Sequence, residues 1–215
     1  VNTVLTTLDL GGNYIRAEGA AAIAEALRGN GVLTDLNLWA NGIGDEGAKA
    51  IGEALAVNGV LTSLDVGSNG LTEEAALGIV RVERQRNKLT SLGLARCNIG
   101  QTGAAEIAEY VSGSGVLTNL NLYWNEIDDE GAAALASALR VNGVLTSLDV
   151  GFNDLTEEAA LGIVRVERQR NKLTSLDLGR CSIGPTGAAE IAEYVSGSAV
   201  LTNLVLMYNN IRDEG

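Results

Sequence analysis

Residues 32–59 read VLTDLNLWANGIGDEGAKAIGEALAVNG, and this stretch decides the fold. Its opening triplet, VLT or KLT, recurs every 28 residues, beginning at Val4, Val32, Val60, Lys88, Val116, Val144, Lys172 and Val200. Self-similarity at one fixed period of this size is the signature of a solenoid built from stacked units. We therefore expect one repeat domain over 1–215, with seven full repeats over 4–199 and a partial eighth over 200–215.

Each unit has the same internal pattern when the leucine after Val or Lys is taken as repeat position 1. The pattern L-x-x-L-x-L-x-x-N-x-I is filled in the second repeat by Leu33, Leu36, Leu38, Asn41 and Ile43. Apolar alternation at positions 4–6 predicts a short strand, and the later GAKAIGEAL stretch has helical spacing. The amide of the position 9 asparagine suits a buried turn, so we expect a ladder of hydrogen bonds from repeat to repeat.

These residues resemble the ribonuclease inhibitor-like class of leucine-rich repeats, and the resemblance extends over the whole chain. The segment NGIGDEGAKAIGEAL is also similar to the repeat domains of NLR-type receptors and of Ran GTPase-activating protein. The resemblance implies a right-handed α/β horseshoe, with a parallel sheet on the concave side and helices on the convex side. It also implies that positions 3, 5, 7 and 8 point to the concave side. Because this scaffold serves many binding tasks, it specifies the fold more than the function.

Two features depart from the repeat pattern. Cys97 and Cys181 replace asparagine at position 9, and we expect both to be small, buried thiols that lie too far apart to pair. Free cysteines and the lack of an Asn-x-Ser/Thr sequon favour a reducing, cytoplasmic location.

Glu83 and Glu167 replace an apolar residue at position 23 of their repeats. Either the helix rotates so that the preceding valine faces inward, or the glutamate pairs with a nearby arginine; we favour the rotation.

The composition argues against an enzyme and against several kinds of ligand. The chain has no histidine and only two cysteines, which excludes a histidine general base and a multi-ligand zinc site. No phosphate-binding loop is present, so we expect no catalytic activity, no cofactor and no metal. The net charge of -12 disfavours nucleic acid and anionic membranes as partners. Basic protein partners remain open.

A second, longer period shows where the chain has diversified. Residues 60–131 align with residues 144–215, and only 12 of the 72 pairs differ. Eleven of these twelve fall at repeat positions 5–13, which hold 27 of the 72 pairs. The copied helices have not changed in the same way, although their exposed positions would tolerate change equally. This distribution favours a diversified binding surface over simple tolerance of loop changes.

The aromatic residues point to the same surface. Five of eight occupy positions 7 or 8, where an exposed ring loses hydrophobic stabilisation unless a partner covers it. The alternative is that these rings stack on one another along neighbouring strands, as Trp124 and Phe152 could, whereas Trp39 has only Ala or Gly beside it. With the arginines and aspartates of nearby positions, the expected protein-binding residues are Trp39, Asp65, Arg96, Tyr123, Trp124, Asp149, Phe152, Asp177, Arg180 and Tyr208.

The sequence therefore predicts a protein-recognition module that binds a partner with basic patches on its concave face. The competing interpretation is an engineered or duplicated scaffold without an evolved ligand. Neither end of the chain has the polar character of a capping repeat, so we expect a segment of a longer array. Bare ends would also favour self-association.

Overall fold

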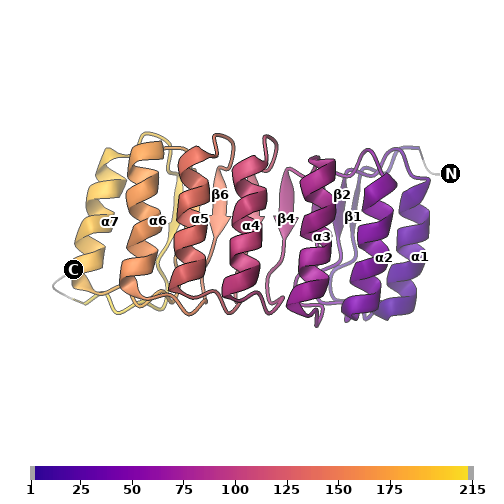
Figure 1. Ribbon diagram of the computed structural model, residues 1–215, viewed down its shortest axis with the longest axis horizontal. Helices are drawn as coiled ribbons and strands as arrows, with labels where there is room; N and C mark the ends of the chain where they lie inside the picture. The colour runs from indigo at the N-terminus through magenta and orange to yellow at the C-terminus, as the bar shows by residue number, and fades with distance from the viewer. Residues whose placement is uncertain (1–2, 213–215) are drawn as a thin grey trace. The chain divides into compact units, whose positions relative to one another are not determined.

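A computed structural model describes residues 3–212, in which short strands alternate with helices along the chain. The chain divides into two compact units, residues 1–98 and residues 99–215. Within each unit taken by itself, the strands form one layer and the helices form another (Figure 1). This arrangement confirms the predicted α/β solenoid, with a parallel sheet on one side and helices on the other.

Over its described residues, 3–98, the first unit contains four strands and three helices. Strands β1 (Thr7–Asp9), β2 (Asp35–Asn37), β3 (Ser63–Asp65) and β4 (Ser91–Gly93) pair in parallel and in register. Helices α1 (Arg16–Arg28), α2 (Gly44–Val57) and α3 (Glu73–Arg86) connect them. The central leucine of β2 to β4 is buried while the residues on either side are mostly half-buried, because successive side chains of a strand point to opposite faces.

The second unit repeats this arrangement. It begins with α4 (Gln101–Gly113) and continues through β5 (Asn119–Asn121), α5 (Asp129–Val141), β6 (Ser147–Asp149), α6 (Glu157–Arg170), β7 (Ser175–Asp177), α7 (Pro185–Gly197) and β8 (Asn203–Val205). Its four strands also pair in parallel, so that the leucines at position 4 of successive repeats are neighbours. Each helix packs against the next, which closes the core with Leu, Ile, Val and Ala side chains.

The predicted asparagine ladder is present in both units. In the first unit, Asn69 donates from Nδ2 to the carbonyl oxygens of Leu38 and Val66 at 2.9 and 2.8 Å. Its Oδ1 atom accepts hydrogen bonds from the backbone N–H groups of Asn41 and Ile43. Asn153 forms the equivalent contacts in the second unit. The ladder satisfies buried backbone groups that no strand or helix pairs.

The two cysteines are free and buried, as predicted. Burial and, to a smaller extent, the charges of neighbouring aspartates raise the pKa of each thiol to about 12. A thiol with such a pKa is almost fully protonated at neutral pH and is a poor nucleophile.

The expectation that the helix turns Glu83 and Glu167 away from the core is wrong. Both side chains have no exposed surface, and each pairs with the arginine three residues later. Arg170 donates to Glu167 Oε1 at 2.6 Å, to the carbonyl oxygen of Asn142 in the preceding repeat and to the carbonyl oxygen of Leu145 at the start of its own repeat. The second carboxylate oxygen of Glu167 accepts from the backbone N–H of Leu173 at 3.0 Å. The buried charge is stable here because every polar group has a partner.

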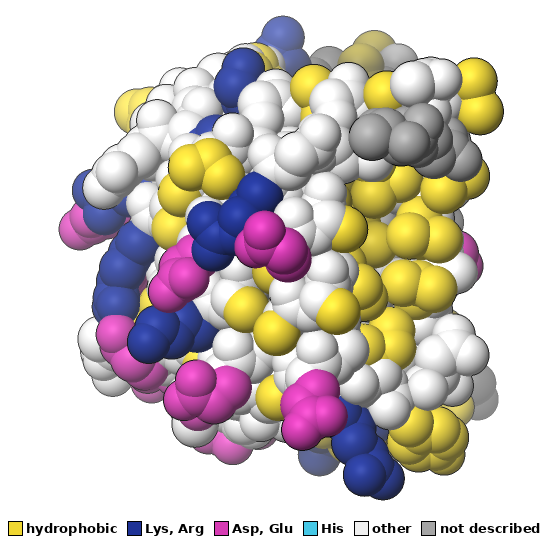
Figure 2. Space-filling view, turned by 90° about the vertical axis from the view of Figure 1, so that its right-hand side faces the viewer, with side chains coloured by type: hydrophobic (Ala, Val, Ile, Leu, Met, Phe, Trp, Pro, Cys, Tyr) yellow, Lys and Arg dark blue, Asp and Glu magenta, His cyan; other side chains and the backbone are white. Residues whose placement is uncertain are grey.

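Each repeat is covered by its neighbours. Figure 2 shows the end of the first unit that carries the first repeat, with hydrophobic side chains gathered on one side and many charged ones on the other. Leu5 of this repeat is 44% exposed, whereas the equivalent Leu33 is 5% exposed and Leu61 has no exposed surface. Stacking therefore supplies the burial that one repeat cannot achieve alone. Within residues 3–212, no helix is both long and apolar enough to cross a membrane.

Candidate functional site

Four aromatic side chains form one connected cluster in the second unit. Tyr123 and Trp124 follow β5, Phe152 follows β6, and Tyr208 follows β8. Trp124 and Phe152 are stacked, with ring centroids 5.3 Å apart and planes inclined by 10°. Phe152 also contacts Tyr123 at 5.0 Å and Tyr208 at 5.4 Å. We call Tyr123, Trp124, Phe152 and Tyr208 the aromatic cluster.

The stacking does not cover the cluster. Trp124 is 44% exposed and Tyr208 is 76% exposed, while Tyr123 and Phe152 are half-buried. The rings therefore do contact one another, as the alternative interpretation predicted. This contact still leaves two large rings exposed to water. Met207, at position 7 beside Tyr208, is also 52% exposed. Together these side chains make an apolar surface of the kind that protein partners cover.

The backbone at position 8 is in the left-handed region in all eight repeats. Trp124, Phe152 and Tyr208 have φ values of 53°, 58° and 56°, and only the first repeat places a glycine, Gly12, at this position. The left-handed region costs a residue with a Cβ atom roughly 1 kcal/mol, and bulky side chains are rare there. The fold tolerates glycine at position 8, so the aromatic residues occupy it at a cost in stability.

Arg180 lies beside the cluster in the seventh repeat. Its guanidinium carbon is 6.0 Å from the centroid of the Phe152 ring, within the range of a cation–π contact. The side chain is exposed and its backbone also has a positive φ, 53°. The structure thus brings together five of the ten predicted binding residues: Tyr123, Trp124, Phe152, Arg180 and Tyr208.

Two more of the predicted residues form a carboxyl pair on the same sheet. Asp149 on β6 and Asp177 on β7 are direct neighbours in the strand register. Each accepts a hydrogen bond through Oδ1 from the backbone N–H of the glycine two residues later, Gly151 at 3.0 Å and Gly179 at 2.7 Å. Burial, together with the charge of Asp177, raises the pKa of Asp149 to about 7 despite the Gly151 hydrogen bond. Burial also raises the pKa of Asp177, against the Gly179 hydrogen bond.

The remaining predicted residues belong to the first unit. Trp39 is 45% exposed, and among residues 3–212 no other ring contacts it, as its small neighbours predict. Asp65 is half-buried and accepts from the Gly67 N–H at 2.8 Å; burial raises its pKa. Arg96 is exposed, with a φ of 54°. These three residues share repeat positions with the second-unit residues but form no comparable ring cluster in the described part of their unit.

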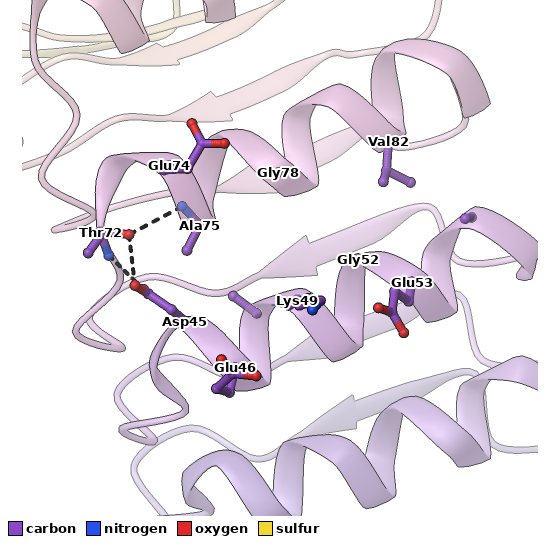
Figure 3. A pocket seen from close by; sticks show the side chains of 12 residues that line it. Asp45, Glu46, Lys49, Gly52, Glu53, Thr72, Glu74, Ala75, Gly78 and Val82 are labelled. Atoms are coloured by element: carbon purple, nitrogen blue, oxygen red, sulfur yellow. Dashed lines mark hydrogen bonds between the residues drawn. The ribbon is translucent and has the colours of Figure 1, made fainter.

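Sequence reasoning missed two features. Met207 was overlooked, although it is one of the twelve changed positions and aligns with Tyr123 when residues 144–215 are compared with residues 60–131. The second feature is a groove of about 530 Å³ between α2 and α3, whose lining includes Ala48, Gly52 and Gly78. Figure 3 shows this groove from close by. The sequence of α3 is identical to that of α6, yet Val82 is half-buried and Val166 is 4% exposed. The small side chains of α2 therefore leave the groove open.

Several of the polar groups around this groove already have partners. Asp45 accepts from the N–H and hydroxyl of Thr72 at 2.8 Å, as the dashed lines of Figure 3 show. Glu53 pairs with Arg28, and Glu74 pairs with Arg81. Binding sites usually combine an apolar wall with a few converging polar groups that are free to bind. The aromatic cluster and the carboxyl pair meet that description better.

The sequence matches the leucine-rich repeat family over eight segments, at residues 1–24, 29–52, 57–80, 86–108, 116–136, 141–164, 170–192 and 197–215. These segments include most of the chain, so the chain belongs to the leucine-rich repeat family. The resemblance stated from the sequence is thereby confirmed. The matching family is defined by its repeat and not by a reaction. No curated protein matches the chain.

Solved structures with this fold include the C-terminal domain of tropomodulin from Caenorhabditis elegans and the leucine-rich repeat protein LegL7 from Legionella pneumophila. The tropomodulin domain is 14% identical, with a TM-score of 0.60 over 70% of this chain and 92% of its own. LegL7 is 18% identical, with a TM-score of 0.60 over 97% of this chain and 67% of its own. The actin-binding site 2 of leiomodin-1 is 30% identical, with a TM-score of 0.49 over 55% of this chain and 70% of its own. The first two likenesses show the fold alone.

Proposed function

We propose that this chain is a protein-recognition module that binds a partner protein through the aromatic cluster of its second unit. One observation carries the proposal: Trp124 and Tyr208 remain 44% and 76% exposed although both belong to a connected ring cluster. An isolated exposed ring is common on protein surfaces, but a cluster of rings on one sheet is a surface that a partner covers.

The strained backbone supports the same conclusion. Aromatic side chains occupy a left-handed position at which the repeat also accepts glycine. Because this conformation destabilises the native state, a scaffold kept for stability alone would favour glycine there. The cost is offset if the rings contribute to binding, since Trp and Tyr are the residue types that dominate binding hot spots.

The proposed partner is a protein with a basic surface, and neither nucleic acid nor an anionic membrane. The net charge of -12 repels phosphate backbones and anionic lipids, and attracts basic surfaces. No catalytic role is proposed, because both thiols have a pKa of about 12 and, within residues 3–212, no three metal-binding side chains come together. We also propose a reducing, cytoplasmic location, in which the two free cysteines stay reduced.

Affinity capture with matched variants tests the proposal. The test variant changes all four cluster residues to serine, and Trp39→Ser is made separately to examine the first unit. The control variant changes Val57 and Val141, which are 63% and 72% exposed at the ends of α2 and α5, to serine. A partner that the parent and control retain should bind the test variant at least about thirtyfold more weakly, the effect of losing roughly 2 kcal/mol of hot-spot energy. Equal binding by all folded variants would contradict binding through the aromatic cluster, and capture of no partner by any of them would support the ligand-free scaffold.

A further inference from the structure

The carboxyl pair is the chemically specific part of the surface beside the aromatic cluster. Both Oδ1 atoms approach the same point: a Cβ atom on Gly151 would lie 2.6 Å from Asp177 Oδ1 and 3.3 Å from Asp149 Oδ1. The next residue in the chain is Phe152, the centre of the ring cluster. The glycine at position 151 therefore makes room for two carboxyl groups directly beside the rings.

Neither carboxyl group has a cationic partner in the described chain. Within residues 3–212, neither Asp149 nor Asp177 forms an ion pair. In this part of the chain, the two side chains accept hydrogen bonds only from the backbone N–H groups of Gly151 and Gly179. Arg180, three residues after Asp177, places its guanidinium over Phe152 instead. Two half-buried negative charges side by side without compensation destabilise the native state, which is typical of a site that binds a counter-charge.

Among the described residues, the register neighbours on either side of the pair carry no positive charge. Asn121 on β5 is the register neighbour of Asp149, and Val205 on β8 is the register neighbour of Asp177. Burial, together with the charges of Asp177 and Asp149, raises the pKa of the Cys181 thiol, so this thiol stays neutral. Within residues 3–212, the charge that acts on Asp149 is that of Asp177, the nearby Cys181 thiol is neutral, and the Arg180 guanidinium lies over Phe152.

We propose that Asp149 and Asp177 together bind one lysine or arginine side chain of the partner protein, and that this contact forms only when both carboxyl groups are ionised. The inference rests on the proposed function and names the chemistry that the surface recognises. The head group lies between the two carboxylates, and the methylene stem packs against the neighbouring apolar side chains, as long basic side chains do. A protein side chain fits better than a metal ion, because no third carboxylate, histidine or cysteine joins the pair within residues 3–212.

The proton requirement follows from the shared site. Two carboxyl groups this close do not ionise together easily in a half-buried environment, and the pKa of Asp149 is already about 7. A bound cation favours the doubly ionised form, so binding releases a proton at neutral pH. Affinity is expected to fall as the pH drops from about 8 to about 6, because Asp149 becomes protonated.

The first unit contains a natural control for the test. Asp65 occupies the same repeat position as Asp149 and accepts the same glycine hydrogen bond. Its register neighbour on β4 is Gly93 in place of Asp177, and position 8 of its repeat is Ser68 in place of Phe152. Asp65→Asn changes the net charge as much as Asp149→Asn does, but it alters neither the carboxyl pair nor the aromatic cluster.

The experiment selects binders for the full chain from a phage-displayed library of random peptides. The selected peptides are then measured against the parent, Asp149→Asn/Asp177→Asn, Asp65→Asn and the four-serine cluster variant. Each Lys or Arg of a selected peptide is also replaced by Gln, which keeps a polar side chain without the charge. We expect one such replacement to weaken binding to the parent about tenfold or more, and to have little effect on binding to the Asp149→Asn/Asp177→Asn protein.

The outcomes separate the two proposals. Coupling between one basic peptide residue and the aspartate pair, retained in Asp65→Asn and lost at about pH 6, supports the cation contact. Some peptides could depend on the rings and yet lose the same affinity for the parent and for the Asp149→Asn/Asp177→Asn protein when a basic residue is replaced by Gln. This result would overturn the cation contact and leave the proposed function standing. Affinity that does not change between about pH 8 and about pH 6 overturns the requirement for ionisation. If no selected peptide depends on the rings, both proposals fail.

Discussion

Trp124 and Phe152 stack face to face across neighbouring repeats, with ring centroids 5.3 Å apart. The two residues are 28 positions apart in the chain, and the parallel register of β5 and β6 brings them together. The repeat therefore converts a column in the sequence into a continuous surface in space. Tyr123 and Tyr208 extend that surface on either side of Phe152.

The stacked pair should contribute measurably to stability. We expect Trp124→Ala and Phe152→Ala to be non-additive, with a coupling free energy of roughly 0.5–1.5 kcal/mol beyond simple burial. Chemical denaturation of the two single variants and the double variant measures this coupling. If the two losses simply add, the rings do not interact in solution as the structure shows.

The buried ion pair of α6 should be far more sensitive than the exposed one nearby. Glu167→Gln leaves Arg170 buried without its charge partner, and we expect it to lower the free energy of unfolding by about 3–5 kcal/mol. Glu193→Gln disrupts the exposed pair with Arg168, and we expect a loss below about 1 kcal/mol. Urea unfolding of the two variants makes the comparison. Similar losses in both would contradict the burial of the Glu167 carboxylate.

Position 8 offers a stabilising substitution in the third repeat. Ser68 has a φ of 57°, and its buried hydroxyl has no hydrogen-bond partner in the described chain. Ser68→Gly relieves the backbone strain and removes the unsatisfied group, so we expect a gain of about 1 kcal/mol in thermal or urea unfolding. Ser68→Ala, which removes the hydroxyl but keeps the Cβ atom, separates the two effects. A destabilised glycine variant would argue against the left-handed backbone at this position.

The stability of the chain should depend on pH through Asp149. Because burial raises its native pKa from 3.8 to about 7, the native state holds a proton that the unfolded state has lost between these values. The free energy of unfolding therefore falls as the pH rises through this range. We expect Asp149→Asn to be more stable than the parent by roughly 1–2 kcal/mol at about pH 8, after allowance for solvent screening, and equally stable near pH 4.

Asp154→Asn, which changes an exposed carboxyl group nearby, provides the control for this measurement. It should change the stability by less than about 0.5 kcal/mol at both pH values. An Asp149→Asn variant that behaves in the same way as Asp154→Asn would contradict the uncompensated burial of Asp149.

The sequence was sufficient to predict the fold because every repeat carries its own strand, turn and helix signals. The Asn69 ladder and the burial of Cys97 followed from their repeat position alone. The pairing of Glu167 with Arg170 could not be predicted in the same way, because its stability depends on the carbonyl groups of Asn142 and Leu145, which lie outside the helix. Helical periodicity describes one helix and contains no information about such a partner.

The binding surface was predictable as a set of positions but not as a shape. Repeat spacing placed Trp124, Phe152 and Tyr208 in one column, whereas the ring angles and the contact between Phe152 and Tyr208 depend on side-chain packing. The left-handed backbone of position 8 gave no local signal, since Trp, Phe and Tyr do not favour it. The α2–α3 groove depends on the volumes of side chains from two helices, which no single segment of sequence reveals.

Tryptophan fluorescence tests the central claim most directly. The chain has two tryptophans, so Trp39→Phe leaves Trp124 as the single indole reporter. If the aromatic cluster is the binding surface, a captured partner without tryptophan should shift the Trp124 emission to shorter wavelength and protect it from an added quencher such as iodide. An unchanged spectrum and unchanged quenching at saturating partner would show that Trp124 stays in water, and would contradict binding at this surface.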